Sequence, residues 1–222
     1  MLFILTGDIQ IGKTRWLQAL VQSLGQAGVL CSGVLAPGEW VPKAEGGFEK
    51  RGIDNTLLPQ GETVPFGRRR DLAQAEGAYD EKSASARAKL AWEISDAAID
   101  RVNAHFAQLA AGEGPKGAFG EFAGPELLIV DEFGQLELLR EEGLTEALAL
   151  VKAGTPKSKE AQTGSEPAAQ GTLAGTPKHC LIVVRDWLIP EAEKKFACAW
   201  GETRIIGPTD EAETPIRHAL GV

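Results

Sequence analysis

The stretch LFILTGDIQIGKTRW, residues 2–16, decides the fold of this chain. It begins with an apolar run, residues 2–6, of the length of a short buried strand. A segment with two glycines follows, and from residue 13 to residue 25 apolar side chains recur at helical spacing. The stretch therefore predicts a strand, a glycine-containing turn and a helix in immediate succession.

The turn matches the Walker A pattern G-x-x-x-x-G-K-[ST] at every fixed position, from Gly7 to Thr14. In such a P-loop, backbone N–H groups of the loop and of the first helical turn surround a β-phosphate, helped by the helix dipole. The residues expected to bind phosphate are Gly7, Asp8, Ile9, Gln10, Ile11, Gly12, Lys13, Thr14 and Arg15. Lys13 is expected to act in catalysis by reaching the β- and γ-phosphates, and the Thr14 hydroxyl to bind Mg²⁺.

An acidic pair supplies the second half of the predicted site. The apolar run 127–130 ends in Asp131 and Glu132, a pattern typical of a strand buried on both faces of a parallel sheet. A carboxylate at the end of a neighbouring strand is what a magnesium ion at a phosphate loop requires, so Asp131 is the second predicted metal ligand. Glu132 is predicted to be the general base that polarises an attacking water. Mg²⁺ is the only cofactor that we expect.

The remaining chain reads as one α/β domain, residues 1–222, because this length supports a single core. A strand at 29–35 completes a right-handed βαβ unit. Strands at 48–58 and 63–66 flank a turn cluster and predict a β-hairpin. The alanine- and leucine-rich segment 81–111 predicts one long helix. Further strands are expected at 181–184 and 204–206, and further helices at 143–153, after Pro190 and at 210–220.

Residues 154–177 differ from the rest of the chain in composition. They consist of Gly, Pro, Ser, Thr, Ala, Gln, Lys and Glu with one leucine, which is too little apolar material to pack. We expect a mobile, low-complexity insertion, and favour a solvated insertion over an active-site lid.

The bulk composition excludes several classes of partner. With 23 basic and 31 acidic residues the formal charge is −8, which argues against nucleic acid or an anionic membrane as the main partner. No apolar run approaches the ~18 residues of a membrane span, and the N-terminal run lacks the form of a signal peptide. The three cysteines show no CxxC spacing. We expect a cytoplasmic monomer whose partners are nucleoside triphosphates.

Three blocks resemble one family, the P-loop nucleoside-triphosphatases of archaea and bacteria whose vertebrate members are called cancer-related nucleoside-triphosphatases. The blocks are residues 7–14, GVLAP at 33–37 with KRGIDNTLLPQGETVPFGRR at 50–69, and LLIVDEFGQLELL at 127–139. The resemblance implies a three-layer RecA-like fold, with a mainly parallel sheet and an added β-hairpin. It also implies slow, magnesium-dependent hydrolysis of ATP, GTP and other triphosphates with little base selectivity.

The chain departs from the family at several positions. Gln10 stands where the family usually has a glycine, and Arg15 where a second threonine is common. After the strand 181–184, Arg185-Asp186-Trp187 replaces a turn that tends to contain histidine.

Some residues have two open interpretations. If the strand 181–184 lies between the two strands of the site, Arg185 would act as an arginine finger in catalysis, or else form a surface salt bridge. Arg51 would approach the phosphates or pair with Asp54. Glu137 would orient Glu132 or cap a helix.

Other side chains are predicted to be structural. Trp40 and Trp187 are the candidates for stacking on a nucleotide base, but we favour a packing role for both. We expect a solvated run at residues 68–70 and surface or helix-end positions for His105, His179 and His218.

Two further functions use the same phosphate site. A small-molecule kinase would need an acceptor pocket, which the hairpin and the long helix would form, with Arg51 or Arg69 gripping an anionic acceptor. A nucleotide-gated binding module would need no water-activating carboxylate at Glu132.

Overall fold

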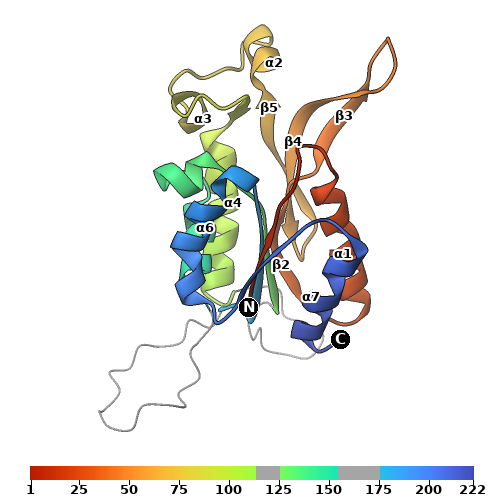
Figure 1. Ribbon diagram of the computed structural model, residues 1–222. Helices are drawn as coiled ribbons and strands as arrows, with labels where there is room; N and C mark the ends of the chain where they lie inside the picture. The colour runs from red at the N-terminus through yellow and green to blue at the C-terminus, as the bar shows by residue number, and fades with distance from the viewer. Residues whose placement is uncertain (114–125, 155–175) are drawn as a thin grey trace, which may run out of the picture.

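The computed structural model describes residues 1–113, 126–154 and 176–222 (Figure 1), so nearly all of the predicted insertion 154–177 lies outside the described residues. Within these ranges nine strands form one sheet in the order β6-β5-β4-β2-β7-β8-β1-β9, with β3 beside β4. The strands are β1 (Leu2–Leu5), β2 (Cys31–Leu35), β3 (Gly38–Pro42), β4 (Phe48–Leu58), β5 (Glu62–Arg69), β6 (Trp92–Ile94), β7 (Leu127–Phe133), β8 (His179–Val184) and β9 (Thr203–Ile206).

The sheet is mixed. Strands β2, β7, β8, β1 and β9 pair in parallel, whereas β4 runs antiparallel to β2, and β3, β5 and β6 continue this antiparallel half. The α/β class and the β4–β5 hairpin are therefore confirmed. A mainly parallel sheet is not confirmed, because β4 pairs directly with β2, and β3, β5 and β6 continue the sheet beyond it.

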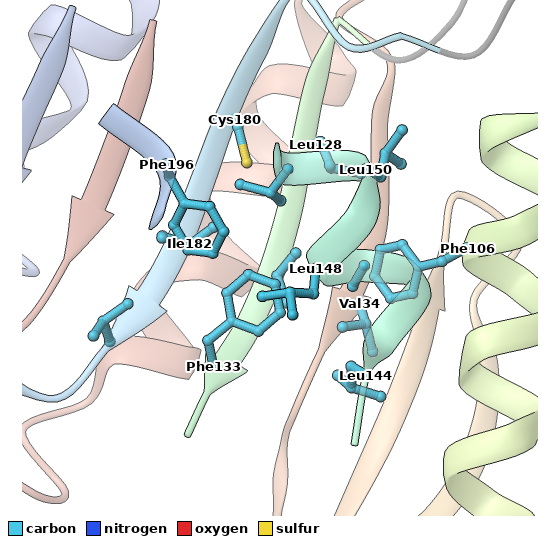
Figure 2. Packing of buried hydrophobic residues seen from close by; sticks show 14 of the residues in the cluster. Val34, Phe106, Leu128, Phe133, Leu144, Leu148, Leu150, Cys180, Ile182 and Phe196 are labelled. Atoms are coloured by element: carbon cyan, nitrogen blue, oxygen red, sulfur yellow. The ribbon is translucent and has the colours of Figure 1, made fainter. Parts of the chain in front are cut away.

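Helices cover both faces of the parallel half (Figure 1). Helices α1 (Lys13–Gln26) and α7 (Glu213–Leu220) lie on one face, and α4 (Asp96–Ala110), α5 (Thr145–Ala153) and α6 (Ile189–Phe196) on the other. Successive residues of a strand point to opposite faces, so Phe3 packs in the core under α1 and Ile4 in the core under α4–α6. The second core contains stacked rings of Phe133 and Phe196, seen in Figure 2.

The prediction of one long helix at 81–111 is wrong. This segment forms α3 (Ala84–Arg87), strand β6 and then α4. Ser95 caps α4 by accepting a hydrogen bond from the Ala98 N–H group at 3.4 Å. Strand β6 pairs with residues 67–69 of β5. Leu90 and Ile94, which matched the helical period, pack in a separate small cluster, so pairing with the hairpin overrides the local helical pattern.

The remaining elements are short. They are α2 (Arg70–Ala75), a π-helical turn η1 (Leu136–Arg140), and the 3₁₀ turns η2 (Asp186–Leu188), η3 (Ala197–Ala199) and η4 (Asp210–Ala212). In the part of the chain that the structure describes, no helix is long and apolar enough to cross a membrane.

Candidate phosphate and phosphoryl-transfer site

The loop between β1 and α1 contains three residues with positive φ angles. Gly7 and Gly12 have φ angles of 130° and 104°, in the region that favours glycine. Gln10 also has a positive φ, 65°, a conformation that glycine adopts more readily than other residues. Gly12 precedes the first turn of α1 and no described side chain caps this helix, so the N–H groups of the first turn are available to an anion.

Two polar contacts define the loop further. The Lys13 Nζ atom donates to the carbonyl oxygens of Gly7 at 2.7 Å and Asp8 at 2.9 Å. The Asp186 carboxylate accepts hydrogen bonds from the Thr6 hydroxyl and from the Gly7 N–H group, and these bonds lower the pKa of Asp186. Asp186 therefore fastens the start of the loop to the end of β8, a role that the sequence analysis missed.

Thr14 and Asp131 lie together, as their predicted shared role requires. Asp131 is only 4% exposed, and it accepts a hydrogen bond from the Ala36 N–H group at 3.0 Å. Burial raises the pKa of Asp131 to about 6, against the opposing effects of this bond and of the nearby Thr14 hydroxyl. A buried carboxylate beside a hydroxyl is a pair of hard oxygen ligands that suits a divalent cation.

Glu132 and Arg185 form the next pair. Strand β8 lies between β1 and β7, as expected, and Arg185 follows its last residue. The Arg185 Nε atom donates to Glu132 Oε1 at 2.8 Å, and both side chains are partly exposed. The predicted base and the predicted arginine finger therefore occupy one corner of the site.

Glu137 braces the turn after β7. Its carboxylate accepts hydrogen bonds from the N–H groups of Gly134 at 2.9 Å and Leu144 at 3.0 Å. Burial raises the pKa of Glu137. Since Leu144 directly precedes α5, these contacts are closer to the capping interpretation, and no hydrogen bond between Glu137 and Glu132 is found in the described ranges.

A cavity of 480 Å³ opens beside these residues. Its lining begins at Thr14, Asp131, Glu132 and Arg185 and continues between the hairpin, β6 and α4. The interior is largely apolar, with Ile53, Phe66, Leu90, Trp92, Ile94, Ile99, Leu136 and Leu144 among the lining residues. The β4–β5 hairpin, β6 and α4 thus form the walls of the cavity.

Lys50 is the cavity residue that sequence analysis missed. It lines the cavity together with Ile53, although strict alternation along β4 would put these two residues on opposite faces. In the β3–β4 pairing Glu39 lies opposite Gly52 and Trp40 opposite Lys50, so Arg51 is an extra residue in β4, and a bulge of this kind cannot be located from residue pattern alone. The Lys50 Nζ atom lies 5.3 Å from the centre of the Trp92 ring. Burial lowers the pKa of Lys50, and Asp131 and Glu132 oppose this shift.

The arginines of the hairpin do not line the cavity. Arg51 donates to Glu49 at 2.7 Å rather than to Asp54. Arg69 pairs with Glu49 and Asp71, and Arg68 with Glu39 and Glu76. Arg68 and Arg69 are therefore engaged in ion pairs rather than freely solvated, whereas the Arg70 guanidinium lies 6.0 Å from the centre of the Tyr79 ring. Neither Arg51 nor Arg69 lines the cavity.

Two tryptophans and a histidine named in the sequence analysis differ in their exposure and in their position relative to the cavity. Trp187 is 57% exposed and lines the cavity rim, whereas Trp40 lies outside the lining. The surface position predicted for His105 is wrong: its ring is buried, and its Nε2 atom lies 3.2 Å from the Gly33 carbonyl oxygen. Helix α4 turns this residue toward β2, because the apolar stripe of the helix includes it.

Comparison with known protein families, with characterised proteins and with solved structures finds no match for this chain. Within the described ranges, no three His, Cys, Asp or Glu side chains lie close enough together to hold a metal by themselves. A cation at Thr14 and Asp131 would thus need further ligands from phosphate oxygens and water, which is the usual arrangement for Mg²⁺ at a triphosphate.

Proposed function

We propose that this protein is a magnesium-dependent nucleoside-triphosphatase that hydrolyses the γ-phosphate of ATP, GTP and other triphosphates with broad base selectivity. The observation that carries the proposal is the proximity of Thr14, at the start of α1, to the buried Asp131 carboxylate: both line one cavity, and the Thr14 hydroxyl lowers the pKa of Asp131. It brings together the two halves of a phosphate and magnesium site that lie 117 residues apart in the chain.

The strand order supports the finer fold assignment. In the parallel half, β2-β7-β8-β1-β9, one strand separates β1 from β7, and helices cover both faces. A three-layer RecA-like domain has this arrangement of its phosphate-loop strand and its acidic strand. The antiparallel strands β3–β6 would then be an addition to that domain.

Mg²⁺ fits the residues present, because Thr14 and Asp131 supply two oxygen ligands. When bound, the ion would neutralise charge on the β- and γ-phosphates. The Lys13 ammonium group would contact phosphate oxygens in place of the loop carbonyls, and the first-turn N–H groups of α1 would surround the β-phosphate.

Glu132 and Arg185 carry the chemistry of the proposal. Glu132 takes a proton from the attacking water, and Arg185 stabilises negative charge on the phosphoryl group that is transferred. Their 2.8 Å contact supports this pairing, because both groups would face the same phosphoryl group. The salt bridge also holds the Glu132 carboxylate in one orientation.

The cavity favours a second candidate, a small-molecule phosphotransferase. In that reaction an acceptor hydroxyl attacks the γ-phosphorus and loses its proton to Glu132, while the bond from the γ-phosphorus to the β–γ bridging oxygen breaks and the nucleoside diphosphate leaves. A cavity of 480 Å³ beside Glu132 is far larger than one attacking water needs.

Phosphate release from ATP, GTP, CTP and UTP, with and without Mg²⁺, tests the proposal. We expect magnesium-dependent release from all four. Glu132→Gln should keep nucleotide binding and lower turnover about 10²-fold, since it removes the general base. Lys13→Ala should abolish nucleotide binding. Glu146→Gln, an exposed residue on α5, is the matched control and should behave as the parent.

Two results would count against this assignment. Equal turnover of Glu132→Gln and the parent would remove Glu132 from the mechanism. Tight triphosphate binding without phosphate release would favour the phosphotransferase.

A further inference from the structure

The size of the cavity is the first observation that hydrolysis leaves unexplained. One water occupies about 30 Å³ in the liquid, whereas this cavity measures 480 Å³. That volume is within the range of small-molecule sites, roughly 300 to 1,000 Å³. The phosphate loop lies at one end only, through Ile9 and Thr14, so most of the space extends away from the nucleotide phosphates.

The interior wall is the second observation. Ile53 of β4, Phe66 of β5, Ile99 of α4 and Leu136 of η1 come from separate elements and leave a space unfilled. An unfilled apolar space lowers the stability of a fold, and a ligand that fills it recovers the lost contacts. Asn55, which also lines the cavity, is 1% exposed, and its Oδ1 atom has no hydrogen-bond partner among the described residues.

The charges in the cavity are the third observation. Asp131 accepts a hydrogen bond from the Ala36 N–H group, Glu132 accepts one from Arg185, and Glu137 accepts two from backbone N–H groups. Each anion therefore has its partners. Lys50 forms no ion pair with any described residue, and the same holds for Lys89 at the exposed rim. The cavity thus contains a lysine, Lys50, that forms no ion pair with a described residue and lies beside an apolar interior.

We infer that the cavity is a binding site for a second small molecule, an anion with an apolar body, whose charged group contacts Lys50 while its body packs on Ile53, Phe66 and Ile99. This ligand binds beside the γ-phosphate end of the nucleotide site and at the same time as nucleotide. The inference goes beyond triphosphate hydrolysis and is tested by binding alone, so it stands or fails separately from turnover.

The test uses 8-anilinonaphthalene-1-sulfonate, a fluorescent aromatic anion, with the full chain. We expect one site per chain, and binding that persists with saturating Mg²⁺ and a non-hydrolysable ATP analogue. Lys50→Met keeps the apolar stem and should raise the Kd about tenfold, as loss of a charged partner predicts. Ile99→Trp should fill the cavity and abolish the site. Trp92→Phe should reduce energy transfer from tryptophan to the bound probe.

Lys43→Met is the matched control, because Lys43 is an exposed lysine in the turn after β3 and should leave the Kd unchanged. Circular dichroism and thermal unfolding establish that each variant is folded. Complete displacement of the probe by the ATP analogue would overturn the inference, because the cavity would then be part of the nucleotide site. Unchanged binding in both Lys50→Met and Ile99→Trp would also overturn it, by placing the probe on an exposed apolar patch.

Discussion

Replacing Asp131 by asparagine should stabilise the protein while removing its magnesium-dependent activity. The carboxylate is 4% exposed and its pKa is raised from 3.8 to about 6, chiefly by burial. Asparagine has nearly the same shape. Its amide oxygen can accept the hydrogen bond from the Ala36 N–H group that Asp131 accepts, and its amide nitrogen can donate to the nearby Thr14 hydroxyl.

The size of the effect follows from the pKa difference between the folded and unfolded chain. The folded state binds the proton more tightly, so this group favours folding fully below about pH 4, and the advantage is lost as pH rises through about 6. Above that pH the buried charge lowers the free energy of unfolding by about 3 kcal/mol, from about two pKa units at roughly 1.4 kcal/mol each. Near pH 5 the corresponding loss is about half as large.

Denaturant unfolding in EDTA, without nucleotide, measures this difference. Asp131→Asn should gain about 3 kcal/mol at roughly pH 7.5, or about 6 to 12 °C in Tm, and about half as much near pH 5. Asp100→Asn, an exposed carboxylate on α4, controls for the loss of one negative charge. The same gain at both pH values, or none near pH 7.5, would refute the burial argument. Hydrolysis by Asp131→Asn should fall to background even where its stability rises.

Two further changes test how the site is held. Gly33 has a φ of 117°, and a Cβ atom there would lie 2.0 Å from the Ile129 carbonyl oxygen, so Gly33→Ala should lower the free energy of unfolding by at least about 3 kcal/mol. Gly25→Ala, where the added methyl group meets nothing within 4 Å on α1, should instead gain about 0.5 to 1 kcal/mol; similar unfolding curves for the two would contradict the clash. Glu137→Ala leaves the N–H groups of Gly134 and Leu144 without their acceptor, and should lower the free energy of unfolding by about 2 to 4 kcal/mol. A loss well below 1 kcal/mol in the same unfolding assay would show that water replaces the carboxylate.

The parts of the site that are contiguous in sequence were predictable. The apolar run before Gly7, the glycines and the helical spacing after Lys13 all follow local rules, and the structure contains β1, the turn and α1 at those places. The strand that carries Asp131 and Glu132, β7, and the β4–β5 hairpin were predictable for the same reason. The division of residues 81–111 into α3, β6 and α4 was not predictable. The local spacing of apolar residues fits one helix, and only the pairing of β6 with β5 shows that part of the segment is a strand.

By itself, the sequence determined which residue types are available for phosphate and magnesium and how each segment folds locally, since those properties depend on neighbours along the chain. Only the tertiary structure decided which distant residues meet. The contact between Arg185 and Glu132 exists because β8 lies beside β7, and Lys50 reaches the cavity because β4 is bulged at Arg51 and pairs with β2. The cavity itself belongs to no segment: it is the space left between β4, β5, β6, α4 and η1, and its size and charge depend on how these elements pack.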